Sequence, residues 1–230
     1  IGSFEFQLIG GRPRYSGFSG YATQPDSLID SFFTTPILSN PEVGDGPHSW
    51  ISAGVVSYQP KWVPGLFLGA TRAVQDIERP SLPLFYFSAF NPIMQEEFEE
   101  DGSFFRNQLL SVFARYMIPK FGFEVYFEMG REDRWWDFED LMTDPFHSTV
   151  WLAGIRRMRK LRGKGHWLET NIEVTKLQAP VSTLIRSTGY TFYSHFNGVG
   201  WTNRGQVLGA GIAPGSNLHH FSVNWHKNYF

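Results

Sequence analysis

The sequence predicts an all-β protein: an antiparallel transmembrane β-barrel, or a large part of one, in a single domain spanning residues 1–230. Segments of alternating apolar and polar residues recur along the chain, and strand side chains alternate between faces with a period of two. Short turns alternate with long polar connections, which is typical of outer-membrane barrels. Aromatic residues make up 17% of the chain and charged residues 18%, below the roughly 25% of soluble domains.

The clearest two-faced segment is residues 109–130, LLSVFARYMIPKFGFEVYFEMG. Pairing Ile118 with Phe123 around the turn places the apolar residues of both arms on one face, which a slip of one residue would destroy. We expect lipid to contact Val112, Ala114, Phe123, Val125 and Phe127. We expect the barrel lumen to receive Arg115, Glu124, Glu128 and, opposite Arg115, Tyr126.

Six further segments alternate in the same way, although less regularly. They are residues 4–11, 50–59, 66–74, 149–159, 167–176 and 217–229. The fourth and fifth are expected to pair as a hairpin, with Ile155 opposite Ile172, which brings the total to about eight strands. Aromatic girdles are expected near the strand ends, at Tyr58, Trp62, Trp151, Trp167 and Trp225. A soluble β-sandwich also alternates, but it would have to explain a continuous aromatic face opposite a charged one.

The connections differ in length. Short turns are expected at residues 60–65, 119–122 and 162–165, and long connections at 12–48, 78–106, 131–147 and 180–216. Within the first two long connections, residues 27–33 are expected to form a helical turn and residues 91–100 a short helix. Basic residues concentrate in residues 156–164, around a short turn, where we expect them to meet water or anionic lipid headgroups.

Composition excludes several classes of function. The chain has 20 basic and 22 acidic residues, so it lacks the basic surface of a nucleic-acid-binding protein. It has no cysteine, which excludes disulfides, thiol nucleophiles and cysteine metal sites. No apolar run approaches the roughly 20 residues of a membrane helix. Because strand side chains alternate between faces, His219 lies on the face opposite His220 and His226, so these three histidines do not form a metal-binding cluster. We expect no metal and no cofactor.

Carboxylates raise the question of glycoside hydrolysis, which requires two of them at a suitable separation. The candidates are Glu124, Glu128, Asp133 and Asp137. Glu124 and Glu128 share one strand face with Arg115, and carboxylates compensated by arginine are ordinary in a barrel lumen. We therefore expect a structural role for them and no enzymatic activity.

Residues 190–225, YTFYSHFNGVGWTNRGQVLGAGIAPGSNLHHFSVNW, resemble the glycine-rich segment of the capsule assembly Wzi family, especially its Bacteroidetes-type relatives. The resemblance depends on Tyr193, His195, residues 201–205, 208–209 and 215–216, and extends to EVYFEMGRED at residues 124–133. It implies a non-catalytic lectin in the bacterial outer membrane that holds capsular or surface polysaccharide on the cell. Family barrels have about twice as many strands, so we expect this chain to be incomplete.

The same segment supplies the candidate polysaccharide site. Sugars stack on aromatic faces while amides and guanidinium groups bind their hydroxyls, and an arginine can bind an acidic sugar's carboxylate in bidentate fashion. The predicted binding residues are Tyr193, His195, Trp201, Asn203 and Arg204, with Arg131 and Asp133 as further candidates. The alternative is a loop packed on itself, in which Arg204 binds backbone carbonyls.

Two other functions remain open from sequence. The chain could be an accessory barrel subunit of a secretion or transport complex, whose long loops would contact other outer-membrane proteins. It could also be a soluble carbohydrate-active enzyme. Outer-membrane lipid is an expected partner both for an accessory barrel subunit and for a polysaccharide-binding barrel.

Overall fold

The structure is a computed structural model. It describes residues 2–13, 49–76, 107–132, 142–146, 148–162, 165–178, 201–203, 206–209, 211–212 and 215–227. The strands of the main sheet are β1 (Ser3–Gly11), β2 (Trp50–Gln59), β3 (Leu66–Asp76), β4 (Asn107–Ile118), β5 (Phe123–Glu132), β6 (Thr149–Lys160), β7 (His166–Lys176) and β10 (Asn217–Lys227). A separate ribbon comprises β8 (Thr202–Asn203) and β9 (Gln206–Val207), and η3 (Pro119–Phe121) is a 3-10 turn.

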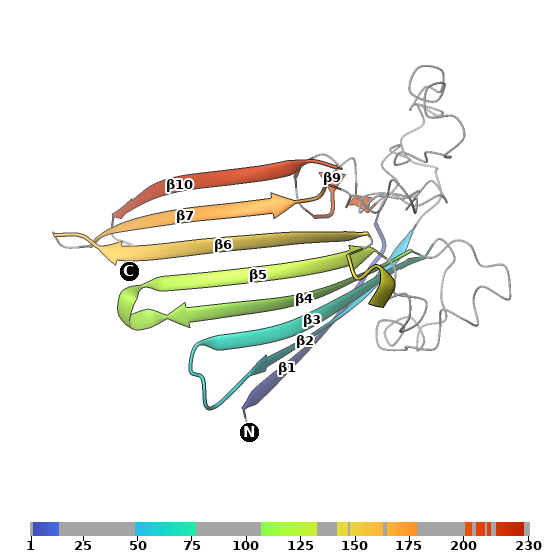
Figure 1. Cartoon of the computed structure of the whole chain (residues 1–230), viewed down its shortest axis with the longest axis horizontal. Helices are drawn as coiled ribbons and strands as arrows, with labels where there is room; N and C mark the ends of the chain where they lie inside the picture. Colours follow the sequence, from blue (N-terminus) through green and yellow to red (C-terminus); the bar gives the residue numbers. More distant parts are fainter. Residues whose placement is uncertain are drawn as a thin grey trace, which may run out of the picture.

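The main sheet has eight strands, each antiparallel to its neighbours, in the order β1-β2-β3-β4-β5-β6-β7-β10 (Figure 1). The all-β antiparallel prediction is confirmed, and each strand expected from alternation is present. β5 continues to Glu132, so Arg131 belongs to a strand and not to the connection that was expected to begin there. The helical turn expected at residues 27–33 and the helix expected at residues 91–100 lie outside the described residues.

The predicted register is confirmed in both hairpins. Ile118 pairs with Phe123 in the first hairpin, and Ile155 pairs with Ile172 in the second. Because every strand in the sheet is paired without a slip, the side-chain alternation of one strand continues into the next. The sheet therefore has two distinct faces across its whole width.

The apolar face is the one that carries Phe127. One row across it consists of Phe4, Tyr58, Leu68, Ala114, Phe127, Ala153, Val174 and His219, and the next row toward the short turns contains Leu66, Tyr116, Val125, Ile155, Ile172 and Phe221. The polar face is the opposite one and carries Arg115, Glu124, Tyr126, Arg156, Glu169, Asn171, Glu173 and His226. The same register puts Trp167 on the polar face, so the prediction that it joins an outward aromatic girdle is wrong.

Side chains on the two faces differ in exposure. On the apolar face Phe127 is 43% exposed and Ile172 49% exposed. On the polar face the side chains of Glu124 and Glu169 are only 17% and 13% exposed. A curved sheet crowds the side chains on its concave side, so this difference indicates that the polar face is the concave one, in keeping with the curvature visible in Figure 1.

The described sheet is open. β1 and β10 each pair with one neighbour among the described residues, and all nine residues of β1 are exposed. An edge strand leaves a row of backbone N–H and C=O groups available for pairing. No helix among the described residues is long and apolar enough to cross a membrane.

The connections at one end of the sheet, on the left in Figure 1, are short turns. Gly65 and Gly122 adopt positive φ angles of 88° and 58° in two of them. The carbonyl oxygen of each glycine accepts a hydrogen bond from the adjoining strand: the Met117 N–H donates to Gly65 O at 2.9 Å and the Met158 N–H donates to Gly122 O at 2.7 Å. A Cβ at Gly122 would clash with the Met158 carbonyl, so this turn requires glycine for both conformation and space.

We expect Gly122→Ala to destabilise the fold by about 2 kcal/mol, because alanine must adopt a left-handed conformation and displace the β6 backbone. Gly11→Ala is the matched control, since a Cβ there meets nothing within 4 Å. The free energy of unfolding of the purified protein measures both effects. Equal stability of the two variants would contradict this account of the turn.

Candidate functional site

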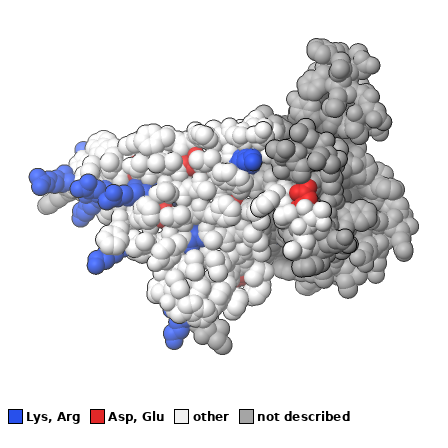
Figure 2. Space-filling view, in the orientation of Figure 1, with Lys and Arg blue, Asp and Glu red and all other residues white. Residues whose placement is uncertain are grey.

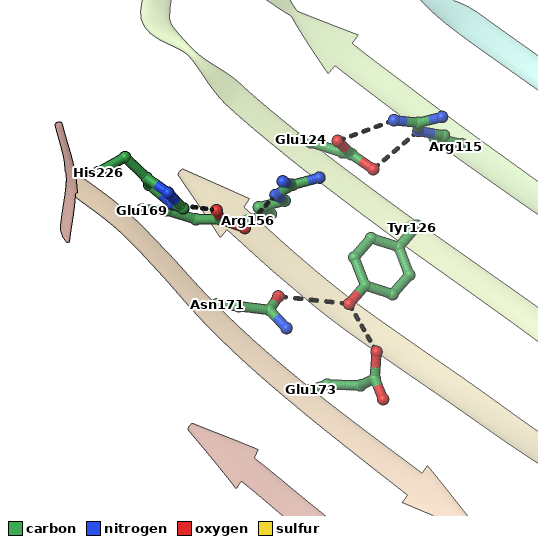
Figure 3. Close-up of polar contacts among 8 residues, drawn as sticks. All are labelled: Arg115, Glu124, Tyr126, Arg156, Glu169, Asn171, Glu173 and His226. Carbon is green, nitrogen blue, oxygen red and sulfur yellow. Dashed lines mark hydrogen bonds and ion pairs between the residues drawn. The ribbon is translucent and has the colours of Figure 1, made fainter. Parts of the chain in front are cut away.

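The polar face carries a set of side-chain contacts that link β4 to β10 (Figure 3). At one position Arg115 on β4 binds Glu124 on β5 in bidentate fashion, with Nε and Nη2 donating to the two carboxylate oxygens at 2.7 and 3.0 Å. The sequence predicted this proximity from the register. The contact occupies both oxygens of one of the carboxylates considered for hydrolysis, which favours a structural role for Glu124.

Glu169 on β7 joins three strands. Its Oε1 accepts a hydrogen bond from Arg156 Nε on β6 at 2.6 Å, and its Oε2 lies 2.9 Å from His226 Nε2 on β10. Each carboxylate oxygen therefore has its own partner (Figure 3). Because Glu169 is largely shielded from water, these two contacts compensate a charge that would be costly to leave alone.

Tyr126 spans a whole strand to reach its partners. It starts on β5, lies opposite Gly154 on β6, and its hydroxyl donates to Glu173 Oε2 on β7 at 2.7 Å. Gly154 in turn lies opposite Glu173, and a Cβ at Gly154 would clash with the tyrosine ring. The hydroxyl also lies 3.3 Å from Asn171 Oδ1, and since its one hydrogen is used by Glu173, the Asn171 amide oriented the other way would donate to it.

Phe113 and Gly69 repeat this arrangement on the neighbouring strands. They are register partners on β4 and β3, and a Cβ at Gly69 would clash with the phenyl ring. A glycine inside a strand marks a place where another group approaches closely. The strand-crossing contact of Tyr126 was not found from the sequence, because the register was predicted only within each of the two hairpins. The signal that would have found it is the register between the two hairpins, which puts Gly154 opposite Tyr126.

Buried polar side chains gather where the strands end at the long connections. They are Ser49, Ser52, Gln75, Arg131, Glu132, Thr149 and Thr175. Gln75 Nε2 donates to Ser49 Oγ at 3.1 Å, and Ser148 Oγ donates to the Glu132 carbonyl at 2.7 Å. Ser148 has a left-handed φ of 50°, and its carbonyl accepts the Glu132 N–H at 3.2 Å, which closes the end of β5 against the start of β6.

Arg131, one of the predicted binding residues, belongs to this buried end and is 4% exposed. It lies on β5 between Leu110 and Thr149, on the same face as Phe127 but closer to the long connections. Its guanidinium is thus part of the protein interior in this structure.

Trp201 and Asn203 lie together on the β8–β9 ribbon, near the end of β7 that adjoins the long connections (Figure 1). Asn203 pairs with Gln206, and the Leu208 N–H donates to the Trp201 carbonyl at 2.8 Å, so the ribbon is a closed hairpin. Trp201 is 4% exposed and its indole N–H makes no hydrogen bond with the described residues. Its ring is enclosed and does not form an open stacking platform here.

The remaining predicted binding residues, Tyr193, His195, Arg204 and Asp133, lie outside the described residues. The described part of the chain holds no group of three or more His, Asp or Glu residues that could bind a metal. The structure thus brings Trp201 and Asn203 onto one ribbon and puts Arg131 at the same end of the sheet, away from the paired charges of the polar face.

These features define a class of protein: a two-faced antiparallel sheet of barrel type, with short turns at one end. The structure of Wzi from Escherichia coli, described as an outer membrane protein involved in group 1 capsule assembly and as a carbohydrate-binding β-barrel, is similar to it, with a TM-score of 0.53. The two are 21% identical, and the match covers 78% of this chain and 35% of Wzi. At this identity the similarity shows the fold alone. No family model and no curated protein matches the sequence.

We expect Gly154→Ala to destabilise the protein by roughly 1–3 kcal/mol, because the added Cβ forces the Tyr126 ring away from Glu173. The same substitution in a Tyr126→Ala background should cost much less, since the clashing ring is then absent. Free energies of unfolding for the four proteins of this double-mutant cycle give the coupling. An equal cost in both backgrounds would show that Tyr126 does not depend on the space at Gly154.

Proposed function

We propose that this chain forms part of an outer-membrane β-barrel that binds capsular or surface polysaccharide and retains it at the cell surface without catalysis. The observation that carries this proposal is the apolar face, which continues without interruption across all eight strands. Phe6 is 66% exposed on it and Phe221 is 66% exposed, at opposite edges of the sheet. An exposed apolar surface of this extent requires a partner, and lipid fits a band that follows a whole sheet.

The polar face supports the same orientation. It carries the ion pairs Arg115–Glu124 and Arg156–Glu169, which suits a lumen lined by polar groups. The short turns then face the periplasm and the long connections the cell exterior. Further strands that pair with the edges β1 and β10 would close the barrel.

The polysaccharide is assigned to the long-connection end. The ribbon that carries Trp201 and Asn203 lies there, and the neighbouring predicted residues Tyr193, His195 and Arg204 are of the types that bind sugars. Wzi, whose fold is similar, is described as carbohydrate-binding, which supports this choice of ligand. Arg131 lies near the end of β5 at this end of the sheet, and Asp133 follows β5 in the sequence; these two residues complete the proposed set.

Insertion into lipid can be tested with one substitution on each face of β5. Phe127→Arg puts a charge in the middle of the apolar face and should reduce stability in bilayers by about 2–4 kcal/mol. Glu128→Arg, on the next residue and the opposite face, should cost far less, because its side chain remains in the polar lumen. Folding titrations in phospholipid vesicles measure both variants. Equal costs, or a protein that stays in the aqueous phase without detergent, would contradict the barrel.

Polysaccharide binding can be tested with the double variant Trp201→Ala/Arg204→Ala. We expect its affinity on an array of acidic and neutral bacterial glycans to fall at least about tenfold, equivalent to about 1.4 kcal/mol. Trp62→Ala is the matched control: Trp62 is 71% exposed in a short turn, at the other end of the sheet, and its loss should leave binding unchanged.

A folded double variant that binds as the wild type does would refute the site. Absence of glycan binding by the wild type, with a stable outer-membrane partner that co-purifies, would instead favour the accessory-subunit function.

A further inference from the structure

At the short-turn end of β6, the residues that follow the last apolar row on the apolar face are basic. Ile155, Arg157 and Arg159 are successive residues on this face, and all three are exposed. Arg157 lies between Phe123 on β5 and Thr170 on β7. Since alternate strand residues are about 7 Å apart, the two arginines follow directly on the apolar band.

Neighbouring segments add charges of the same sign. Lys227 on β10 lies on the apolar face opposite His166, and Arg162 lies in the β6–β7 turn. Lys120 lies in η3, which adjoins β6 through the hydrogen bond from Met158 to Gly122. We call this set, Arg157, Arg159, Arg162, Lys120 and Lys227, the basic fringe; all five side chains are exposed. Figure 2 shows Lys and Arg gathered at this end of the molecule.

No carboxylate of the described residues accompanies the basic fringe on the apolar face. The described acidic residues either lie on the polar face, as Glu124 and Glu169 do, or belong to the long-connection end, as Asp144 does. Arg156 shows the contrast: it precedes Arg157 on the same strand, points to the polar face and pairs with Glu169 at 2.6 Å. Within the described part of the chain, a carboxylate therefore accompanies the arginine on the polar face, and none accompanies Arg157 and Arg159 on the apolar face.

Aromatic side chains accompany the basic fringe. Trp225, 60% exposed on the apolar face, stacks on His166 with ring centroids 5.3 Å apart, and Phe121 is 63% exposed beside Lys120. Tryptophan and long basic side chains favour the boundary between hydrocarbon and headgroups, because their apolar parts stay in the acyl region while their polar ends reach water.

We propose that the basic fringe binds the phosphodiester headgroups of anionic phospholipids in the leaflet that the short turns reach. The inference depends on the proposed insertion into a membrane and adds a specific lipid partner at one end of the barrel. Arginine presents parallel N–H donors that match phosphate oxygens in bidentate geometry, and several adjacent cations without carboxylates complement an anionic surface. Lipid is the chosen occupant because the same strands bring the apolar face into direct continuity with these charges.

The test compares lipid retention by the full chain in nanodiscs of phosphatidylethanolamine containing increasing fractions of phosphatidylglycerol. After extraction, native mass spectrometry counts the phosphatidylglycerol molecules that remain bound. We expect Arg157→Gln/Arg159→Gln to retain at least about fivefold less phosphatidylglycerol than the wild type, with the difference reduced in high salt. Millimolar inorganic phosphate should not displace the lipid.

Two controls separate charge from fold. Arg157→Lys/Arg159→Lys keeps both charges and should retain most of the lipid, while Lys176→Gln removes a charge near the other end of the apolar face and should change nothing. Equal retention by the wild type and the double glutamine variant would overturn the lipid site, as would displacement by inorganic phosphate. Failure of the wild type to enter nanodiscs at all would instead refute the membrane assignment on which the site depends.

Discussion

The structure depends on one constraint: a continuous register that preserves side-chain alternation across eight paired strands. Strand side chains alternate with a period of two, so a slip of one residue between any two neighbours would mix the faces. The pairs Ile118–Phe123 and Ile155–Ile172 show the register in two of the hairpins. Gly122 helps to fix this register, because its left-handed conformation completes the turn between the end of β4 and the start of β5.

Each face meets a different physical requirement. On the concave polar face, charges are close together and partly shielded, so each needs a partner, and Glu169 obtains two from strands on either side of its own. Tyr126 reaches Glu173 only because Gly154 leaves the intervening strand bare. In the middle of the apolar face no such pairing is required. The exposed aliphatic and aromatic side chains of this face require an apolar environment instead. In the proposed orientation, the basic fringe lies where that environment ends.

Alternation in the sequence was sufficient to predict the strands, the register of the two hairpins and the proximity of Arg115 to Glu124, since all three follow from local periodicity and a tight turn. It could not predict contacts between non-adjacent strands, such as Tyr126 with Glu173, because these depend on the space left by Gly154 and on sheet curvature. Trp167 was wrongly expected to face outward, since position near a strand end does not determine the face. The burial of Trp201 was not predicted either, because a motif of residue types does not encode which of its members are covered.

The central claim is that lipid covers the apolar face. The chain contains no cysteine, so single variants Phe127→Cys and Glu128→Cys can each carry one nitroxide label on adjacent residues of opposite faces. In reconstituted vesicles, spin relaxation measures access to oxygen, which concentrates in the bilayer, and to a water-soluble nickel complex. The account predicts a label at position 127 accessible mainly to oxygen and a label at position 128 accessible mainly to the nickel complex. Equal access of the nickel complex to both positions would contradict it.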